Sequence, residues 1–370
     1  MIDLNLLKQV EATQHQYIFN FVLMNVIFLL GFLFRKNRQT FFFTWLLILI
    51  FCLFAYWDTD YFTFRGIFYT SLADFRDPFY YYWGLISFNS YTVFRFYIWG
   101  LALLLLFKTS QHLKINRNTL AFVFPIFFLL LFSYARASLG MAMYFYGLSF
   151  LLVPKKNKTI ISYIWGILFI CFSYFGHRSM LLPIALTPLI FFKFNKYVIS
   201  ALLVIGFIIG RSAETLLSMA SLEGLPIESS VFKAASEGFE AYAAKDTVVE
   251  YNWKYTLTQN LKNIGLSISF VYLIWKCYIP QNKINIANWC LRLLNVCTGI
   301  FVIAISILLV DGLGAGIIGY RFLYMLGIPF SLIIAYLYSK EFCKPFTLFL
   351  VLLSMILFNE GFVFGKILSF

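Results

Sequence analysis

Charge is scarce in this chain of 370 residues. Charged residues make up 12% of the sequence and hydrophobic residues 61%, with 16 acidic residues, 29 Lys or Arg and three histidines. A soluble globular domain is about one-quarter charged, so this composition excludes one. The six cysteines fall mostly inside apolar runs, and their spacing matches neither a disulfide framework nor a metal site. We therefore expect no metal and no other cofactor.

The sequence is instead rich in apolar runs of near 20 residues, which recur from end to end. A run of that length is what an α-helix needs to cross a bilayer. We predict an all-α polytopic membrane protein in which residues 1–370 form a single membrane domain with about twelve transmembrane helices. The predicted spans are 17–34, 41–57, 91–107, 119–134, 137–153, 160–176, 179–192, 197–210, 257–275, 287–310, 320–338 and 346–364.

The segments between the spans alternate in charge. Six of them hold fifteen Lys or Arg and one acid, Glu341, whereas the alternate segments and the termini hold the other fifteen acids. The positive-inside rule places the basic set in the cytoplasm and both termini outside. The net charge of +13 then reflects membrane topology, and we expect no nucleic-acid partner. The basic segments are 35–38, 108–117, 154–158, 193–196, 276–283 and 339–344.

Two of the predicted external segments are long. Segment 58–90 is too polar to span the membrane and is rich in Tyr and Trp, which favours short helices at headgroup depth. Segment 211–256 is broken by Pro226, and Val231–Ala244 can form an amphipathic helix within it. We expect the second segment to cap the outer face; a solvated loop is the alternative.

Seven arginines fall in external segments or at external span ends, where the positive-inside rule disfavours them. The guanidinium group offers a fixed fork of donors that matches phosphate oxygens, so the cluster points to a lipid-linked phosphate or pyrophosphate. The alternative is that each arginine pairs with a nearby aspartate. The arginines are Arg65, Arg76, Arg95, Arg136, Arg178, Arg211 and Arg321, and the aspartates are Asp58, Asp60, Asp74, Asp77 and Asp311.

His177 is the one histidine at a predicted external span end, whereas His15 and His112 have the pattern of plain loop residues. A neutral imidazole can accept a proton from a sugar hydroxyl. It can equally orient a phosphate or bond to backbone, and the bases could instead be aspartates 58, 60 and 77. Glycines within 311–319 precede Tyr320 and could let backbone approach a phosphate, although helix packing explains them as well.

Four segments, in this order, resemble the EpsG family of Wzy-type polysaccharide polymerases. The third departs from the family pattern at Ala137, where Gln is expected after the arginine, and the fourth has Gly176 where the family has an aromatic residue. The resemblance covers roughly residues 15–340. The segments are DTDYFTFRGIFY (58–69), FRDPFYYYW (75–83), YARASLGMA (134–142) and GHRSMLLP (176–183).

The resemblance implies a GT-C-like, metal-independent glycosyltransferase in the bacterial cytoplasmic membrane. Such enzymes join oligosaccharide repeat units carried on undecaprenyl pyrophosphate, which is both donor and acceptor, at a site facing the outside or periplasm. Membrane lipids surround them, and a chain-length regulator protein is a further partner that the resemblance allows. The remaining alternatives are an O-antigen ligase, a membrane acyltransferase, and a flippase or transporter of the same lipid. A transporter would show mid-membrane charges and paired broken helices, and the mid-span positions here are almost uncharged.

Under this resemblance we expect Arg136 and Arg321 to hold the pyrophosphate and His177 to act as a base or an orienting group. The other expected substrate-binding residues are Arg178, Arg211, Arg65, Arg76, Asp60, Asp77 and Tyr320.

Overall fold

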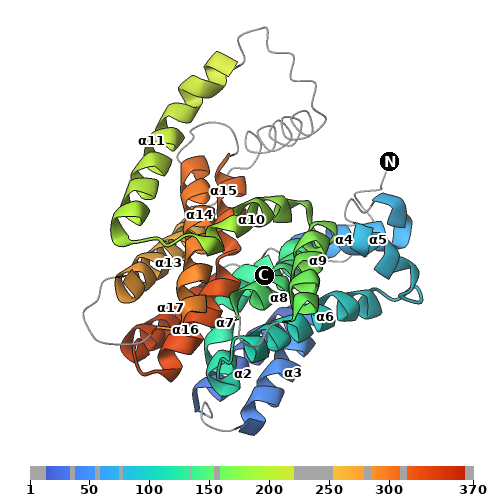
Figure 1. The fold of residues 1–370 in the computed structure, drawn as a ribbon. Helices are drawn as coiled ribbons and strands as arrows, with labels where there is room; N and C mark the ends of the chain where they lie inside the picture. Colours follow the sequence, from blue (N-terminus) through green and yellow to red (C-terminus); the bar gives the residue numbers. More distant parts are fainter. Residues whose placement is uncertain are drawn as a thin grey trace. The chain divides into compact units, whose positions relative to one another are not determined.

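The described part of the chain is helical throughout its regular structure (Figure 1). Its helices form two compact units, the first running to Thr187 and resuming at Gly327, and the second comprising Pro188–Leu326. The computed structural model describes residues 14–33, 38–54, 59–74, 78–133, 135–153, 159–220, 253–278, 286–308 and 315–362.

The first unit contains most of the helices. They are α2 (Gln14–Leu33), α3 (Arg38–Phe54), α4 (Thr59–Thr70), the 3₁₀ helix η1 (Leu72–Asp74), α5 (Pro78–Leu85), α6 (Tyr91–His112), α7 (Arg117–Ser133), α8 (Ala135–Leu152), α9 (Ile160–Gly176), η3 (Arg178–Met180), α10 (Leu181–Leu186), α16 (Gly327–Ser339) and α17 (Lys344–Phe362). The second unit holds most of η4 (Thr187–Phe191), with α11 (Lys196–Ala220), α13 (Trp253–Tyr278), α14 (Asn288–Leu308) and α15 (Ala315–Tyr324).

Every predicted span contains helix, but two of them are interrupted. The seventh consists of η3, α10 and η4, because Pro188 has no N–H to bond the carbonyl of Ile184 and the α-helix cannot continue. The eleventh breaks into α15 and α16 at a turn that includes Met325. Pro329 has no N–H to bond the Met325 carbonyl four residues earlier, and its ring would crowd that carbonyl. The break at Met325 is therefore the position at which Pro329 interrupts an α-helix.

Apolar length and surface both indicate a membrane protein. Three helical segments are long and apolar enough to cross a bilayer: Tyr91–His112, Asn288–Leu308 and Gly319–Ser339. Several shorter apolar helices accompany them. Large apolar side chains are exposed along α2, α3, α9 and α11, among them Phe42 at 65% and Ile160 at 77%. A water-facing surface does not carry such bands, whereas lipid contact accounts for them.

The core of the first unit forms around α16. Its residues from Gly327 to Ala335 are buried, as expected for a helix that is apolar on every side. Helix α7 packs against it, with the rings of Phe127 and Phe330 6.1 Å apart. In the second unit α14 has the same role, because α11, α13 and α15 all pack on it or on each other, and Phe270 of α13 stacks on Phe301 at 4.1 Å.

The helix ends that flank four of the basic segments meet at one end of the first unit. The end of α2 lies against the start of α7, with the rings of Phe32 and Phe122 6.2 Å apart. Tyr338 at the end of α16 packs on Phe122 at 5.3 Å, and His112 at the end of α6 is 3.0 Å from the Ser149 hydroxyl near the end of α8. Because the charge alternation assigns all four segments to one side of the membrane, this clustering is the arrangement it requires. We call it the basic end.

Candidate active site

The opposite end of the first unit is built on a close pairing of α8 and α9 (Figure 1). The two helices run antiparallel and touch at glycines. A Cβ at Gly147 would lie 2.7 Å from the carbonyl oxygen of Gly166, and a Cβ at Gly176 would lie 2.9 Å from the Cα of Gly140. Small residues let helix backbones approach this closely. The first turn of α8 and the last turn of α9 are therefore held together by backbone contact.

This contact brings together two segments that hold expected site residues, the start of α8 and the turn after α9. Arg136 lies in the first turn of α8, one turn before Gly140. A Cβ on Gly140 would lie 3.2 Å from the backbone nitrogen of His177. His177 follows α9 directly and its side chain is half-buried, while Arg178 beside it is exposed. The α8–α9 contact thus positions the backbone of Arg136 next to the His177 segment; the Arg136 side chain lies outside the described atoms.

The His177 ring is fixed by Ser179, two residues later. The Ser179 backbone N–H donates to His177 Nδ1 at 3.1 Å, and the Ser179 hydroxyl lies 2.6 Å from the same nitrogen. The imidazole thereby caps η3. A ring nitrogen that accepts a backbone N–H carries no proton, so the neutral ring has its proton on Nε2. His177 is therefore oriented as an Nε2–H donor. Sequence reasoning missed Ser179, although the His-x-Ser spacing was its signal.

The segment after His177 folds back along α8. The Tyr144 hydroxyl donates to the carbonyl of Pro183 at 2.8 Å and lies 3.1 Å from the Thr187 hydroxyl. Tyr144 is fully buried, so these bonds satisfy its polar atom inside the unit. This anchor fixes the path of η3 and α10, and with it the position of the His177 turn.

Helices from the predicted interfacial segment 58–90 pack at the same end. Both α4 and α5 are present as helices, and Phe79 of α5 lies 6.3 Å from Phe175 of α9. Tyr80 packs on Phe94 of α6 at 5.9 Å. Segment 58–90 therefore connects the start of α6 to the His177 end of α9. Arg65 lies in α4 with a half-buried side chain.

Arg95, one of the seven outward arginines, has a structural role. Its side chain is only 4% exposed, and both Nε, at 2.7 Å, and Nη2 donate to the carbonyl of Cys52 in the last turn of α3. The orphan carbonyls at a helix C-terminus favour a cation there. Both donors are thus used on a helix end, which is a different role from the phosphate contact that the sequence suggested.

The remaining expected residues are distributed as follows. Asp60 lies in α4, with a side chain outside the described atoms, and Arg76 and Asp77 lie outside the described residues, as does the amphipathic stretch 231–244. Arg211 falls inside α11, which continues beyond the predicted span to Ala220. Its side chain, too, is outside the described atoms.

Tyr320 and Arg321 belong to the second unit and lie in α15, both half-buried. Gly319 beside them packs on the end of α14: a Cβ there would lie 2.5 Å from Leu308 Cγ and 3.1 Å from the Ala304 carbonyl. For this glycine the packing interpretation is confirmed. The absence of a side chain at Gly319 lets α15 pack closely against α14.

Within the described residues no group of three or more His, Cys, Asp or Glu could hold a metal ion.

The model of the EpsG family matches residues 37–368, nearly the whole chain. The protein belongs to the EpsG family. Members of this family are Wzy-type polymerase-like, so the chain is a membrane protein of the polysaccharide-polymerase-like, glycosyltransferase-like class. Neither the comparison with curated proteins nor the comparison with solved structures gives a match.

The packing of α8 against α9 explains why this chain has Gly176 where the EpsG family has an aromatic residue. In this EpsG-family chain the position touches the Gly140 backbone at a distance that leaves no room for a Cβ, let alone an aromatic ring. A large residue there would require a different α8–α9 contact.

Proposed function

We propose that this EpsG-family protein is a GT-C-like, metal-independent polymerase. It joins oligosaccharide repeat units carried on undecaprenyl pyrophosphate, at the outer leaflet of the bacterial cytoplasmic membrane. The observation that carries the proposal is the α8–α9 end, where an arginine in the first turn of α8 and an oriented histidine are brought together by glycine contacts. The twelve-span topology remains part of the proposal, and it places this end outside.

The reaction we propose needs charge neutralisation more than acid catalysis. An acceptor sugar hydroxyl attacks the anomeric carbon of the donor chain, the new C–O bond forms, and the bond from that carbon to the pyrophosphate oxygen breaks. The electron pair leaves with the polyprenyl pyrophosphate, which is already a good leaving group. Prearranged donors stabilise the charge that develops on it. We assign this role to Arg136; for Arg321, which belongs to the second unit, pyrophosphate binding remains a proposal from the sequence alone.

For His177 the hydrogen bonds favour the orienting role over the base. With Nδ1 accepting the Ser179 N–H, the neutral ring offers a donor at Nε2 and has no second lone pair to take a proton. It would donate to a phosphate oxygen or to a sugar oxygen of the substrate. The proton of the attacking hydroxyl then passes to Asp60, Asp77 or water. Arg178, Arg65, Arg76, Arg211 and Tyr320 remain substrate-binding proposals.

The test is the polysaccharide profile of a strain that lacks the gene, complemented with the wild-type chain or a variant. Loss of a polymerase leaves single repeat units on the acceptor in place of a ladder. A ligase defect leaves no repeat unit on the acceptor core while polymer accumulates on its lipid carrier. The first pattern, restored to a ladder by the wild-type chain, supports the proposal, and the second contradicts it.

A transporter of the same lipid is the second candidate, because the seventh and eleventh spans are interrupted. Discontinuous helices form substrate sites in secondary transporters. Here prolines account for both interruptions, so the observation favours a transporter weakly. A transport defect would leave repeat units on the cytoplasmic leaflet, where external glycosidases cannot reach them. A polymerase defect leaves them outside and sensitive.

The sidedness of the site is tested by reporter fusions in the intact membrane. Fusions after Asn157 and after Lys344 should report the cytoplasm, and a fusion at Glu237 should report the outside. An external signal at Asn157 would put the α8–α9 site on the cytoplasmic side and contradict an outer-leaflet reaction.

A further inference from the structure

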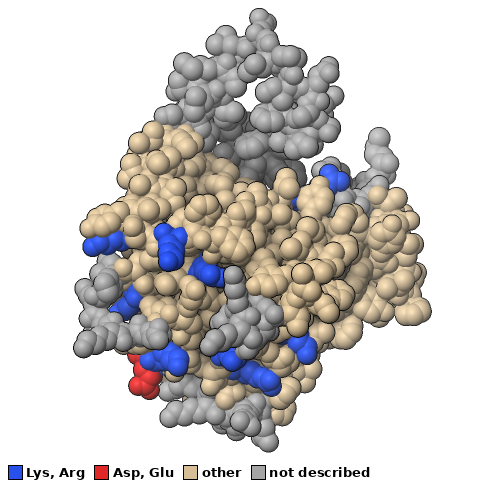
Figure 2. All heavy atoms as spheres, viewed as in Figure 1, with Lys and Arg blue, Asp and Glu red and all other residues tan. Residues whose placement is uncertain are grey.

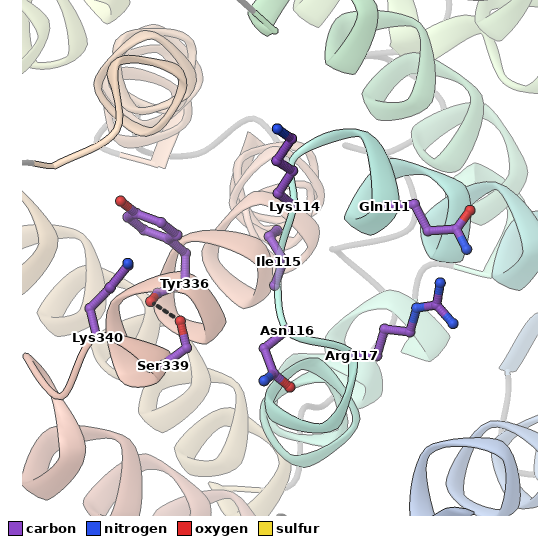
Figure 3. A pocket seen from close by; sticks show the side chains of 8 residues that line it. All are labelled: Gln111, Lys114, Ile115, Asn116, Arg117, Tyr336, Ser339 and Lys340. Atoms are coloured by element: carbon purple, nitrogen blue, oxygen red, sulfur yellow. Dashed lines mark hydrogen bonds between the residues drawn. The ribbon is translucent and has the colours of Figure 1, made fainter. Parts of the chain in front are cut away.

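A pocket of about 570 Å³ lies at the basic end of the first unit, between the α6–α7 turn and the end of α16 (Figure 3). The volume is within the range of about 300–1,000 Å³ typical of ligand pockets. Three cations line it, Lys114 and Arg117 from one turn and Lys340 from the other. No Asp or Glu is among its described lining residues. The pocket is separate from the candidate active site, which is built at the opposite end of the same unit.

The cations surround the pocket and do not converge on one point. In Figure 3 the backbone of 114–116 runs between Tyr336 and Lys340 on one side and Gln111 and Arg117 on the other. The guanidinium carbon of Arg117 also lies 4.9 Å from the centre of the Phe107 ring, within the range of a cation–π contact. Cations spread in this way, with neutral donors between them, suit an extended headgroup with several oxygens better than a single small ion.

Backbone hydrogen bonds hold the two turns, which fixes the positions from which the cationic side chains extend. The Ile115 N–H donates to the Ser110 carbonyl at 2.9 Å, and Lys114 between them adopts a left-handed conformation with φ 55°. The end of α16 repeats this arrangement: the Phe342 N–H donates to the Leu337 carbonyl at 3.1 Å, with φ 69° at Glu341. Such helix ends usually place glycine at the left-handed position. Both turns here use charged residues instead, at some cost in backbone strain.

The basic segments that form the two turns, 108–117 and 339–344, contain one acid, and it does not line the pocket. That acid, Glu341, forms an ion pair with Lys344 at 2.7 Å. Figure 2 shows several Lys and Arg side chains, in blue, on the face in view. An anion entering the pocket therefore meets a positive field.

We propose that this pocket binds the phosphate-bearing headgroup of an anionic lipid of the cytoplasmic leaflet. Both turns belong to the basic segments that the positive-inside rule places in the cytoplasm, at the level where anionic headgroups lie. Tyr336 on its rim has the amphipathic character that suits this depth. Basic pockets between transmembrane helices on this side bind lipid phosphates. The proposal does not depend on the glycosyl-transfer reaction.

The test uses the full-length chain in detergent, with lipid retention measured by native mass spectrometry. The probes are dioctanoyl phosphatidylglycerol, dioctanoyl phosphatidylcholine and glycerol 3-phosphate. The pocket variant is Lys114→Gln/Lys340→Gln. The matched control is Lys193→Gln/Lys196→Gln, which removes the same charge from two exposed lysines of another basic segment that do not line the pocket.

Wild-type protein and the control should retain phosphatidylglycerol in preference to phosphatidylcholine. The pocket variant should lose affinity for phosphatidylglycerol by about tenfold or more, since each cation near a headgroup contributes appreciably. Raised salt should weaken retention in the wild type. Arg117→Gln, a single change, should lower affinity by a smaller factor and serves if the double variant is not monodisperse.

Two results would overturn the proposal. Equal losses in the pocket variant and the control would show a general effect of net charge and no pocket. Binding of glycerol 3-phosphate as tight as that of phosphatidylglycerol would assign the pocket to a soluble phosphate.

Discussion

Gly176→Ala would place a methyl group between the backbones of α8 and α9, directly before His177. The new Cβ would lie 2.9 Å from both the Cα and the nitrogen of Gly140. Ordinary contact begins at 3.4 Å, and because both neighbours are backbone atoms the helices must separate by about 0.5 Å. Forced separation of packed elements costs about 1–3 kcal/mol. Displacement of reacting groups on the scale of 1 Å costs about 10²-fold in rate, so we expect a loss of at least about tenfold.

Gly100→Ala is the matched control, since it makes the same change within α6. Its Cβ would meet only the Phe96 ring, at 3.8 Å, which is an ordinary contact. The assay is polymer formed from purified lipid-linked repeat units, with the thermal midpoint of each purified variant measured in the same detergent. We expect Gly176→Ala to lose polymer formation at a temperature where the protein is still folded. We expect Gly100→Ala to match the wild type in polymer formation, with a thermal midpoint at or above that of the wild type, because alanine favours a helix more than glycine does.

Wild-type polymer formation by Gly176→Ala, at an unchanged thermal midpoint, would refute this reasoning. It would show that the α8–α9 contact tolerates a Cβ and that the position of His177 does not depend on it. A fall in thermal midpoint with the rate preserved would leave the contact standing but remove its link to the reaction.

Three further predictions use the same assay. Arg136→Lys keeps the charge but loses the fork of donors, and should lower polymer formation by about 10²-fold; near-normal activity at normal membrane levels would remove the pyrophosphate role. His177→Gln should retain much of the activity that His177→Ala loses, because an amide N–H can replace the Nε2–H donor; equal inactivity of both would favour a base. Arg95→Met should lower the free energy of unfolding by about 1–3 kcal/mol, since it leaves the Cys52 carbonyl without its buried donors, and should act on thermal stability more than on rate per folded molecule.

The sequence alone predicted where the helices lie. It also predicted which connecting segments are basic. Apolar runs of bilayer length can only be helices with every backbone group bonded, so their existence follows from local composition. The alternation of basic segments can also be read from the sequence, and the helix ends that flank four of them do meet at one end of the first unit. The family motifs at 134–142 and 176–183 were also visible as residue patterns.

Side-chain roles required the tertiary structure, because they depend on which helices touch. Arg95 has the same composition and location signals as Arg136, yet it is buried on the Cys52 carbonyl. His112, expected in a loop, lies in the last turn of α6, half-buried between aromatic rings of α8, with Phe150 4.5 Å away. No local pattern distinguishes these cases, since the partners are 43 and 38 residues distant in the chain.

His177 shows most clearly what the sequence determined and what required the tertiary structure. The sequence located His177 at a span end and left it as a base or an orienting group. The bond from the Ser179 N–H to Nδ1 sets the neutral tautomer, and it forms because the chain turns from α9 into η3 at that residue. That turn is held by the Gly140–Gly176 contact and by the Tyr144 bond to Pro183. Both contacts join residues distant in sequence, so the proton's place on the ring was decided by the packing of α8 against its neighbours.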